Sequence, residues 1–341
     1  MGAKLSKHEF NVIRMKASTS IPTQLARGGS TLFTEVRKPD FAVVHGASID
    51  LVDQSTFMDL ANISCPGEQL TSARLSPDAQ LILAATQMGN IEMWALSDDG
   101  WTCIHTLRSV HGGCAWAVEW LTGIGFASVG ADGKLVIWQL HTDRSLGDKL
   151  VKCVIHSKSV TCISVVPGVA SALIVTGSND STVMVNDLAY EPTGRCVLTP
   201  RSRLVGHVEQ VVCVDCFKSP EYCLVASGGT DRSIRLWDLS DVSAGDVDSP
   251  VPHVTFPYQE EVVSVKFSSN GRFVVAADPI YIHTLSSPMH GVQPQKLAMI
   301  NLRLASPISD VWWTRSTTHL HAVLLNGDLL EISVPKKYYS K

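Results

Sequence analysis

Long hydrophobic runs are missing from this chain of 341 residues. No stretch reaches the roughly 18 consecutive apolar residues of a membrane-spanning helix, and the start of the chain lacks the apolar run of about 7 to 15 residues that marks a secretory signal. We therefore expect the protein in a reducing compartment, the cytoplasm. The nine cysteines stand mostly inside apolar runs such as "VVCVDCF", where reduced thiols pack as small hydrophobic groups.

A large excess of charge of one sign is also missing. The chain has 28 basic and 32 acidic residues and a formal net charge of −4, which gives no general attraction to nucleic acid or to an anionic membrane. Basic residues form no stripe with interleaved aromatic residues, so no nucleic-acid partner is expected. The hydrophobic fraction of 45% against 18% charged residues predicts a globular protein with a large core.

Sequence motifs for catalysis and cofactor binding are absent. The chain contains no GxxxxGK[ST], HExxH or GxSxG pattern, and "GIGFASVG" lies between two expected strands with no helix to face a phosphate. Cys213 and Cys216 have C-x-x-C spacing, but residues three apart on a strand point to opposite faces and no second pair follows. We expect no enzyme, no cofactor and no metal site.

A repeated unit predicts the fold. The stretch that begins at Gly206 reads "GHVEQVVCVDCFKSPEYCLVASGGTDRSIRLWDLS": three apolar runs separated by turns. Related units begin at His111 and His156. Self-similarity at about 40 to 50 residues, with short strands in each unit, is typical of the blades of a β-propeller.

The best unit resembles the WD40 family, through Gly206-His207 and Trp237-Asp238. In that family a hydrogen-bonded chain joins the histidine, a strand Ser or Thr, a turn Asp and the Trp ring nitrogen. The resemblance implies three such networks: His207, Ser227, Asp231 and Trp237; His111, Ser128, Asp132 and Trp138; and His156, Thr176 and Asp180, with Asn186 in place of Trp. Repetition in successive blades favours a structural role. The alternative, a catalytic His-Asp pair, requires His207 and Asp231 to be exposed in a cleft.

Weaker units complete the expected ring. They occupy residues 69–96, 260–286 and 307–334, and four earlier strand-like segments, the first being "STLFTEV", precede residue 64. The last unit lacks one strand, and an open ring would expose unpaired backbone. The sequence therefore predicts an all-β fold: a single seven-bladed WD40 propeller over residues 10–335, closed by residues 10–16 as the outer strand of the last blade, after a flexible segment 1–9 and before a basic tail 336–341.

The resemblance also implies a partner surface. In the family the Gly-His segments and Asp turns lie on one edge, here named the top rim, where many relatives bind peptides. Alignment of the units places seven residues there: Gln69, Ser159, Gln210 and Glu261 ahead of first strands, and Ala131, Asn179 and Thr230 before the turn Asp. The long segments after the third strands, such as residues 141–150 and 189–201, are expected as loops on the opposite rim.

The first residues fit a lipidation pattern. "MGAKLS" matches M-G-x-x-x-[ST], which predicts N-myristoylation of Gly2; the alternative is an ordinary flexible start. A single myristoyl chain binds bilayers only marginally, so a second signal is needed. Basic residues at the two ends of the chain supply a candidate membrane patch: Lys4, Lys7, Lys336, Lys337 and Lys341.

The expected function is that of a non-catalytic scaffold for protein–protein interaction in the cytoplasm, tethered peripherally to the cytosolic face of a membrane when Gly2 is acylated. The alternative is a soluble subunit of a larger complex, in which the terminal residues contact protein instead of lipid. Fold resemblance cannot distinguish trafficking, signalling, chromatin and ciliary complexes.

Overall fold

The computed structural model describes eleven stretches of the chain: residues 12–16, 41–52, 59–65, 68–168, 171–190, 195–242, 252–289, 293–301, 306–314, 318–325 and 328–334.

The described strands form antiparallel sheets that follow one another along the chain. The first sheet contains β2 (Phe41–His45), β3 (Ser48–Val52) and β4 (Asp59–Ser64). The next contains β5 (Leu70–Leu75), β6 (Leu81–Thr86), β7 (Ile91–Ser97) and β8 (Gly100–Leu107). It is followed by β9 (Ala115–Leu121), β10 (Gly125–Gly130), β11 (Lys134–Leu140) and β12 (Leu146–Val154).

Four further sheets continue the series. One contains β13 (Val160–Pro167), β14 (Ser171–Ser178), β15 (Thr182–Tyr190) and β16 (Cys196–Val205). Another contains β17 (Val211–Lys218), β18 (Cys223–Gly229), β19 (Ser233–Asp238) and β20 (Val254–Pro257). Then come β21 (Ser264–Phe267), β22 (Phe273–Ala277), β23 (Tyr281–Ser286) and β24 (Lys296–Asn301). The last contains β25 (Ile308–Trp313), β26 (His319–Leu324), β27 (Leu329–Ser333) and, from the start of the chain, β1 (Val12–Lys16).

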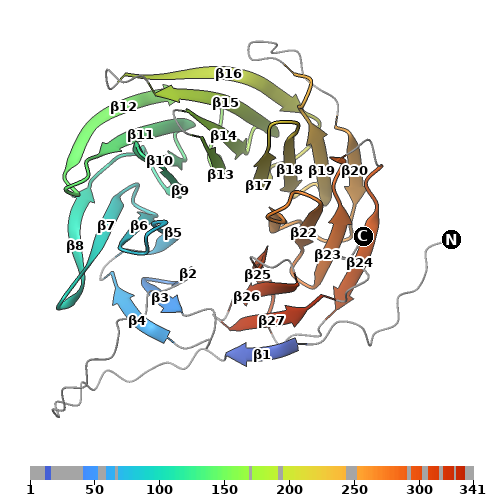
Figure 1. Cartoon of the computed structure of the whole chain (residues 1–341), viewed down its shortest axis with the longest axis horizontal. Helices are drawn as coiled ribbons and strands as arrows, with labels where there is room; N and C mark the ends of the chain where they lie inside the picture. Colours follow the sequence, from blue (N-terminus) through green and yellow to red (C-terminus); the bar gives the residue numbers. More distant parts are fainter. Residues whose placement is uncertain are drawn as a thin grey trace.

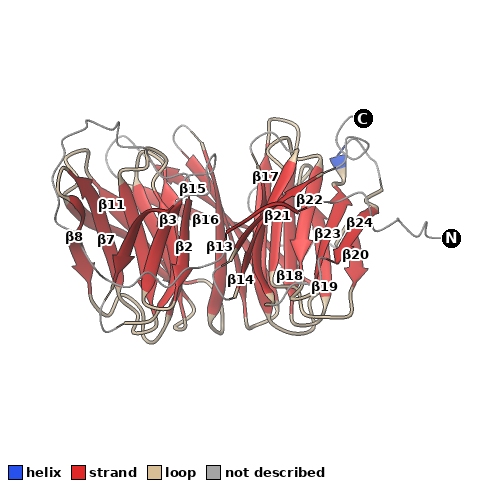
Figure 2. Cartoon of the chain, turned by 90° about the horizontal axis from the view of Figure 1, so that it is seen from below, coloured by secondary structure: helices blue, strands red, loops and turns tan. Residues whose placement is uncertain are grey.

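The sheets are arranged around a common centre as the blades of a β-propeller (Figure 1). The first strands of successive sheets contact one another at the centre, β5 with β9, β9 with β13, β13 with β17, β17 with β21 and β21 with β25. The fourth strands, such as β8, β12 and β16, lie on the outside, and the side view shows a flat disc (Figure 2). The all-β propeller predicted from the sequence is confirmed.

Burial decreases from the middle of a blade to its outer edge. Every residue of β6, β10 and β18 is buried, because a middle strand has a neighbouring blade on each face. The outer strands β8 and β12 contain many exposed residues. This gradient explains why the second strand of a unit reads as a continuous apolar run such as "CLVAS", whereas the outer strands β12 and β16 carry charges.

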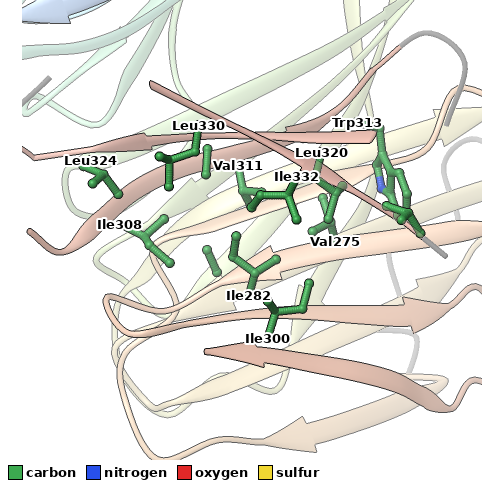
Figure 3. Close-up of a cluster of buried hydrophobic side chains, with 13 residues drawn as sticks. Val275, Ile282, Ile300, Ile308, Val311, Trp313, Leu320, Leu324, Leu330 and Ile332 are labelled. Carbon is green, nitrogen blue, oxygen red and sulfur yellow. The ribbon is translucent and has the colours of Figure 1, made fainter. Parts of the chain in front are cut away.

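The hydrophobic cores lie between adjacent blades. In the cluster of Figure 3, Ile282 and Ile300 of one blade pack with Val311, Leu320 and Ile332 of the next. At about 25 cal/mol per Å² of apolar area, these interfaces supply the main drive for folding. The C-x-x-C cysteines pack into different cores, Cys216 on one side of its blade and Cys213 on the other, as the strand periodicity predicts.

The structure differs from one sequence expectation and leaves another outside its range. In two of the blades, much of the segment expected as a loop is instead a long outer strand, β12 from Leu146 and β16 from Cys196. These strands are exposed and contain many polar residues. Their composition therefore resembled that of a loop. Of the four strands expected before residue 64, β2, β3 and β4 are described, and "STLFTEV" lies outside the described residues.

The strand at the start of the described chain pairs with the last one. β1 is antiparallel to β27, with Arg14 opposite Glu331 and Met15 opposite Leu330. The sheet order is β1-β27-β26-β25, so β1 takes the outer position in this sheet. Figure 1 shows the two strands side by side at the periphery.

Candidate functional site: buried histidine networks, the top rim and a central channel

The complete network lies in the β17–β20 blade. His207 contacts Asp231 through Nδ1 (2.9 Å) and Ser227 through Nε2 (2.8 Å), and the Trp237 indole N–H donates to Ser227 Oγ at 3.0 Å. The histidine and aspartate side chains are only 1% and 3% exposed. A Cβ on Gly206 would lie 3.1 Å from the Trp237 ring, so the glycine of the Gly-His pair leaves room for the indole.

Two neighbouring blades contain shorter networks. His111 contacts Asp132 and Ser128, each at 2.9 Å, but the Trp138 indole nitrogen makes no hydrogen bond to a described residue. Val110 precedes this histidine where Gly206 precedes His207, and Val110 and Trp138 pack in the same hydrophobic cluster. Trp138 instead lies under the Lys149 ammonium at 4.9 Å, a cation–π contact.

The β13–β16 blade has the third network. His156 Nδ1 is 3.1 Å from Asp180 Oδ2, and Nε2 is 3.0 Å from Thr176 Oγ1. Asn186 stands at the tryptophan position, and its Nδ2 is buried without a hydrogen bond to a described residue. The network therefore ends at Thr176.

The aspartates of these networks are held as carboxylates. Burial alone would raise the pKa of Asp132, but hydrogen bonds from His111 and the Gly112 N–H lower that pKa to about 2. The pKa values of Asp180 and Asp231 lie below their usual range for the same reason. Because both ring nitrogens of each histidine already have partners in the protein, the networks tie the Asp turn to the strands and leave no nitrogen for a substrate.

The β21–β24 blade contains a histidine–aspartate pair that the sequence analysis missed. His283 Nε2 is 2.8 Å from Asp278 Oδ2, and both residues are buried. Tyr258 stands ahead of the inner strand, where His207 stands in the preceding blade, and its ring centroid is 4.1 Å from that of His283. The histidine comes from the third strand, β23, so a search for Gly-His segments could not find it; its signal was the short Asp278–His283 spacing.

The predicted partner residues lie on the same rim as the histidine networks. Paired backbone hydrogen bonds join equivalent positions, from Asn179 N to Ser159 O and from Thr230 N to Gln210 O, both at 3.0 Å. Gln69 takes the corresponding place in the β5–β8 blade, where its carbonyl accepts from Gln87. Gln69, Gln210 and Glu261 are exposed, whereas Ala131, Ser159, Asn179 and Thr230 are partly exposed.

Exposed apolar side chains accompany these polar residues. Val208, directly after the network histidine, is 79% exposed, and Met88, in the turn beside Gln87, is 68% exposed. Trp116 is 41% exposed and lines the central channel. The sequence analysis missed all three, because an apolar residue near a strand end reads as core when its burial is unknown.

The central channel is a polar cavity of about 360 Å³. Polar and charged side chains link its lining strands: Arg74 of β5 donates to Glu119 of β9 at 2.6 Å, and Ser264 of β21 donates to Asp310 of β25 at 2.5 Å. This arrangement joins strands of different blades that share no sheet hydrogen bonds.

Asp215 of β17 links the neighbouring strands β13 and β21. It accepts from Ser164 Oγ at 2.9 Å and from the Phe267 N–H at 2.7 Å, and it lies 3.6 Å from Lys266 Nζ. Burial alone would lower the pKa of Lys266, but the carboxylates of Asp215 and Asp310 raise it above its ordinary value. The channel therefore contains permanent charges that stabilise one another across blades.

Comparison with known families agrees with this geometry. The model of the family "WD domain, G-beta repeat" matches residues 147–187 and 194–238. Two stretches of the chain therefore match WD40 repeats. Each matched WD40 repeat begins at the outer strand of one blade and ends in the third strand of the next, β12 to β15 and β16 to β19. A repeat thus bridges two blades, and the two matched repeats contain the His156 and His207 networks.

Several curated proteins are similar at low identity. The "Ribosome biogenesis protein WDR12 homolog" of Brugia malayi is 25% identical over 61% of this chain and 47% of its own length. The "Cilia- and flagella-associated protein 52" of Mus musculus is 25% identical over 63% of this chain and 31% of its own. The "Pre-rRNA-processing protein IPI3" of Mycosarcoma maydis is 27% identical over 43% and 25%. The chain spans less than half the length of these relatives.

The predicted lipidation site and membrane patch lie outside the described residues: Gly2, Lys4, Lys7, Lys336, Lys337 and Lys341. Among the residues that are described, no helix has the length and apolar character needed to cross a membrane.

Proposed function

We propose that this WD40 protein is a non-catalytic scaffold that binds a protein partner with its top rim. The observation that carries the proposal is the combination on that rim of exposed apolar side chains, Val208 and Met88, with exposed polar ones such as Gln210. The buried networks fix the turns beneath them, so the surface is preorganised, and little ordering entropy opposes binding.

A catalytic use of the histidine networks is disfavoured by their burial. Catalysis by His207 and Asp231 requires contact with a substrate, yet these side chains are 1% and 3% exposed and bond each other and Ser227. The same arrangement recurs at His111 and His156, as expected of an architectural element. An interaction scaffold needs no active site.

The relatives support membership of a complex but favour no single process. Proteins named for ribosome biogenesis and for cilia are equally identical to this chain, at 25%. The second candidate function, a soluble structural subunit of a larger assembly in which the chain ends contact protein, is compatible with both. The two candidates differ in whether Gly2 carries a lipid.

We also propose that the propeller has seven blades and closes through β1, with residues 10–335 as one domain between a short N-terminal segment and a basic tail. The antiparallel pairing of β1 with β27 supports this, because closure covers an edge that would otherwise be free to aggregate.

Cysteines placed at Arg14 and Glu331 test the closure. These residues are opposite each other in the β1–β27 pair, and directly paired antiparallel residues have Cβ atoms about 5 Å apart. We expect mild oxidation of the double variant to produce a disulfide-linked peptide joining the two ends, detected by mass spectrometry. Each single variant, which retains the nine native cysteines, should produce none. Absence of the linked peptide in the double variant would contradict closure.

Membrane tethering through Gly2 is the finer part of the proposal. The lysines at the two ends of the chain would add electrostatic attraction of about 1 kcal/mol each to an anionic leaflet. A myristoyl chain with such a patch satisfies the two-signal requirement. The protein would then lie in the cytoplasm at the membrane surface, with its top rim free.

One purification experiment tests both parts. Tagged wild type, Val208→Glu, Met299→Glu and Gly2→Ala are expressed with a myristate analogue, and partners and N-terminal peptides are identified by mass spectrometry. Met299 is the matched control, because it is apolar and 62% exposed but lies on the outer strand β24. We expect Val208→Glu alone to lose partners at least tenfold, and Gly2→Ala alone to lose the label and membrane recovery.

Other outcomes separate the candidates. Equal partner recovery by Val208→Glu and Met299→Glu would refute the top-rim surface. An unlabelled wild-type N-terminus would refute the lipid anchor and favour the soluble subunit.

A further inference from the structure

Two adjoining cavities form a groove on the outside of the propeller, between β12 of one blade and β15 and β16 of the next. Their volumes are about 480 and 370 Å³. Both are lined by Val154, Ile155 and Met184, so they are continuous. Figure 1 shows β12 and β16 along the outer edge of the ring. The groove extends from Pro200 toward the top rim at Ser157.

The groove exists because a large side chain is missing there. Asn186 is opposite Ile174 in its sheet, as Trp237 is opposite Val225 in the next blade, so the two residues occupy equivalent positions. Trp237 is fully buried and fills the corresponding space. The smaller Asn186 leaves that space open to the outside, bounded by the β12 residues opposite.

A coordinated change supports this explanation. Ile155 precedes His156 where Gly206 precedes His207. Gly206 is in close contact with the Trp237 ring, so a glycine is needed where the indole is present. With Asn186 in place of tryptophan, Ile155 is tolerated, and it contributes an apolar wall to the groove.

The floor of the groove carries an unpartnered donor. Asn186 is 1% exposed, lines the groove, and its Nδ2 makes no hydrogen bond to a described residue. A buried polar group without a partner is costly, and a ligand atom that accepts its hydrogen bond recovers that cost. The side chain that fits here is one with an apolar body and an acceptor at its tip.

The remaining lining defines the ligand further. The walls are apolar, with Leu150 and Leu198 facing the space, and the two cavities contain exposed arginines, Arg195 and Arg203. The one carboxylate of the lining, Asp180, is already bonded to His156. Neither arginine forms an ion pair with an acidic residue in the described part of the chain. The electrostatic complement is therefore an acidic ligand.

The strands beside the groove favour an extended backbone. β12 and β16 are long outer strands of 9 and 10 residues, and each is the terminal strand of its sheet. Terminal strands offer backbone N–H and C=O groups to an added strand. A peptide following the groove can use them while one side chain enters the space beside Asn186.

We propose that this groove binds an extended acidic peptide segment that inserts a tyrosine side chain into the space left by the missing tryptophan. The ring packs against Ile155 and Leu198, the phenol oxygen accepts from Asn186 Nδ2, and acidic residues on either side contact Arg195 and Arg203. The proposal extends the scaffold function to a second surface, distinct from the Val208 region of the top rim.

Fluorescence polarisation with defined peptides tests the proposal. The probes are labelled 12-residue peptides with a central tyrosine flanked by glutamates, the same peptide flanked by lysines, and the glutamate peptide with glycine for tyrosine. We expect wild type to bind the glutamate–tyrosine peptide at least tenfold more tightly than the other two. Asn186→Trp, which restores the residue of the neighbouring blade and fills the groove, should weaken this binding at least tenfold.

Charge variants test the proposal even if Asn186→Trp does not fold. The double change Arg195→Glu and Arg203→Glu should abolish the preference for glutamate over lysine flanks, whereas Arg108→Glu, an exposed arginine outside the groove, should preserve it. Unchanged melting temperatures establish that the variants are folded. Val208→Glu should bind the peptide like wild type, which separates failure of this proposal from failure of the top-rim proposal.

Three results would overturn the proposal: equal binding of the three peptides, undiminished binding by folded Asn186→Trp together with the arginine double variant, or a wild-type dimer in sedimentation that Asn186→Trp dissociates. The last result would assign the groove to a second copy of this chain.

Discussion

Replacing Trp237 with alanine is expected to lower the free energy of unfolding by about 3–5 kcal/mol. The indole is completely buried between two blades, it packs in the core formed with Val214 and Val225, and its N–H donates to Ser227. Alanine removes the apolar contacts, leaves a cavity and deprives the network of one donor. Urea unfolding followed by far-ultraviolet circular dichroism measures the change.

Trp138→Ala is the matched control for this prediction. Trp138 occupies the equivalent strand position in another blade but is partly exposed, and its indole nitrogen makes no hydrogen bond to a described residue. We expect a loss of about 1–2 kcal/mol, within the ordinary range for single substitutions. Equal destabilisation by the two variants would contradict the importance of the complete network.

Asp215→Ala should lower the free energy of unfolding by about 3 kcal/mol, the lower end of the range for removing one partner of a buried ion pair. The substitution leaves the Phe267 N–H without its acceptor and takes the nearest carboxylate from Lys266. The lower end applies because the Lys266 side chain is 28% exposed and water in the channel can solvate it. The same urea measurement applies.

A double-mutant cycle identifies the cause of this loss. Adding Lys266→Met to Asp215→Ala removes the unpaired ammonium, so the double variant should be more stable than the sum of the single losses predicts. Asp215→Asn, which keeps a carbonyl acceptor for the Phe267 N–H, should lose less than Asp215→Ala. If the losses of stability caused by Asp215→Ala and by Lys266→Met simply add, the two charges act independently.

Much of the fold could be predicted from the sequence because the characteristic residues of the repeat recur at similar spacing. The apolar runs give the strands, and the histidine, hydroxyl and aspartate positions coincide in register, as Ser227 and Thr176 show by their equivalent pairing in adjacent blades. Such positions align without any knowledge of the structure. The candidate rim residues follow from the same alignment.

Features that depend on contacts between blades could not be predicted in this way. Arg74 and Glu119 come from different repeats, and nothing in either repeat alone indicates the other. Trp138 makes no hydrogen bond to Ser128, and nothing at the aligned network positions indicates this. His283 replaces the usual histidine from another strand. Each of these features depends on contacts with neighbouring side chains, which the periodicity of the sequence does not predict.

The equivalence of Asn186 and Trp237 has a consequence for how such a molecule diversifies. A position that recurs in successive blades can be altered in one of them without disturbing its copies. Exchange of a single aromatic residue there opens a recess on one flank, and the rest of the disc retains its shape. Successive exchanges at different blades would give related proteins distinct flanks on the same framework, so variation can accumulate on the perimeter while the centre stays constant.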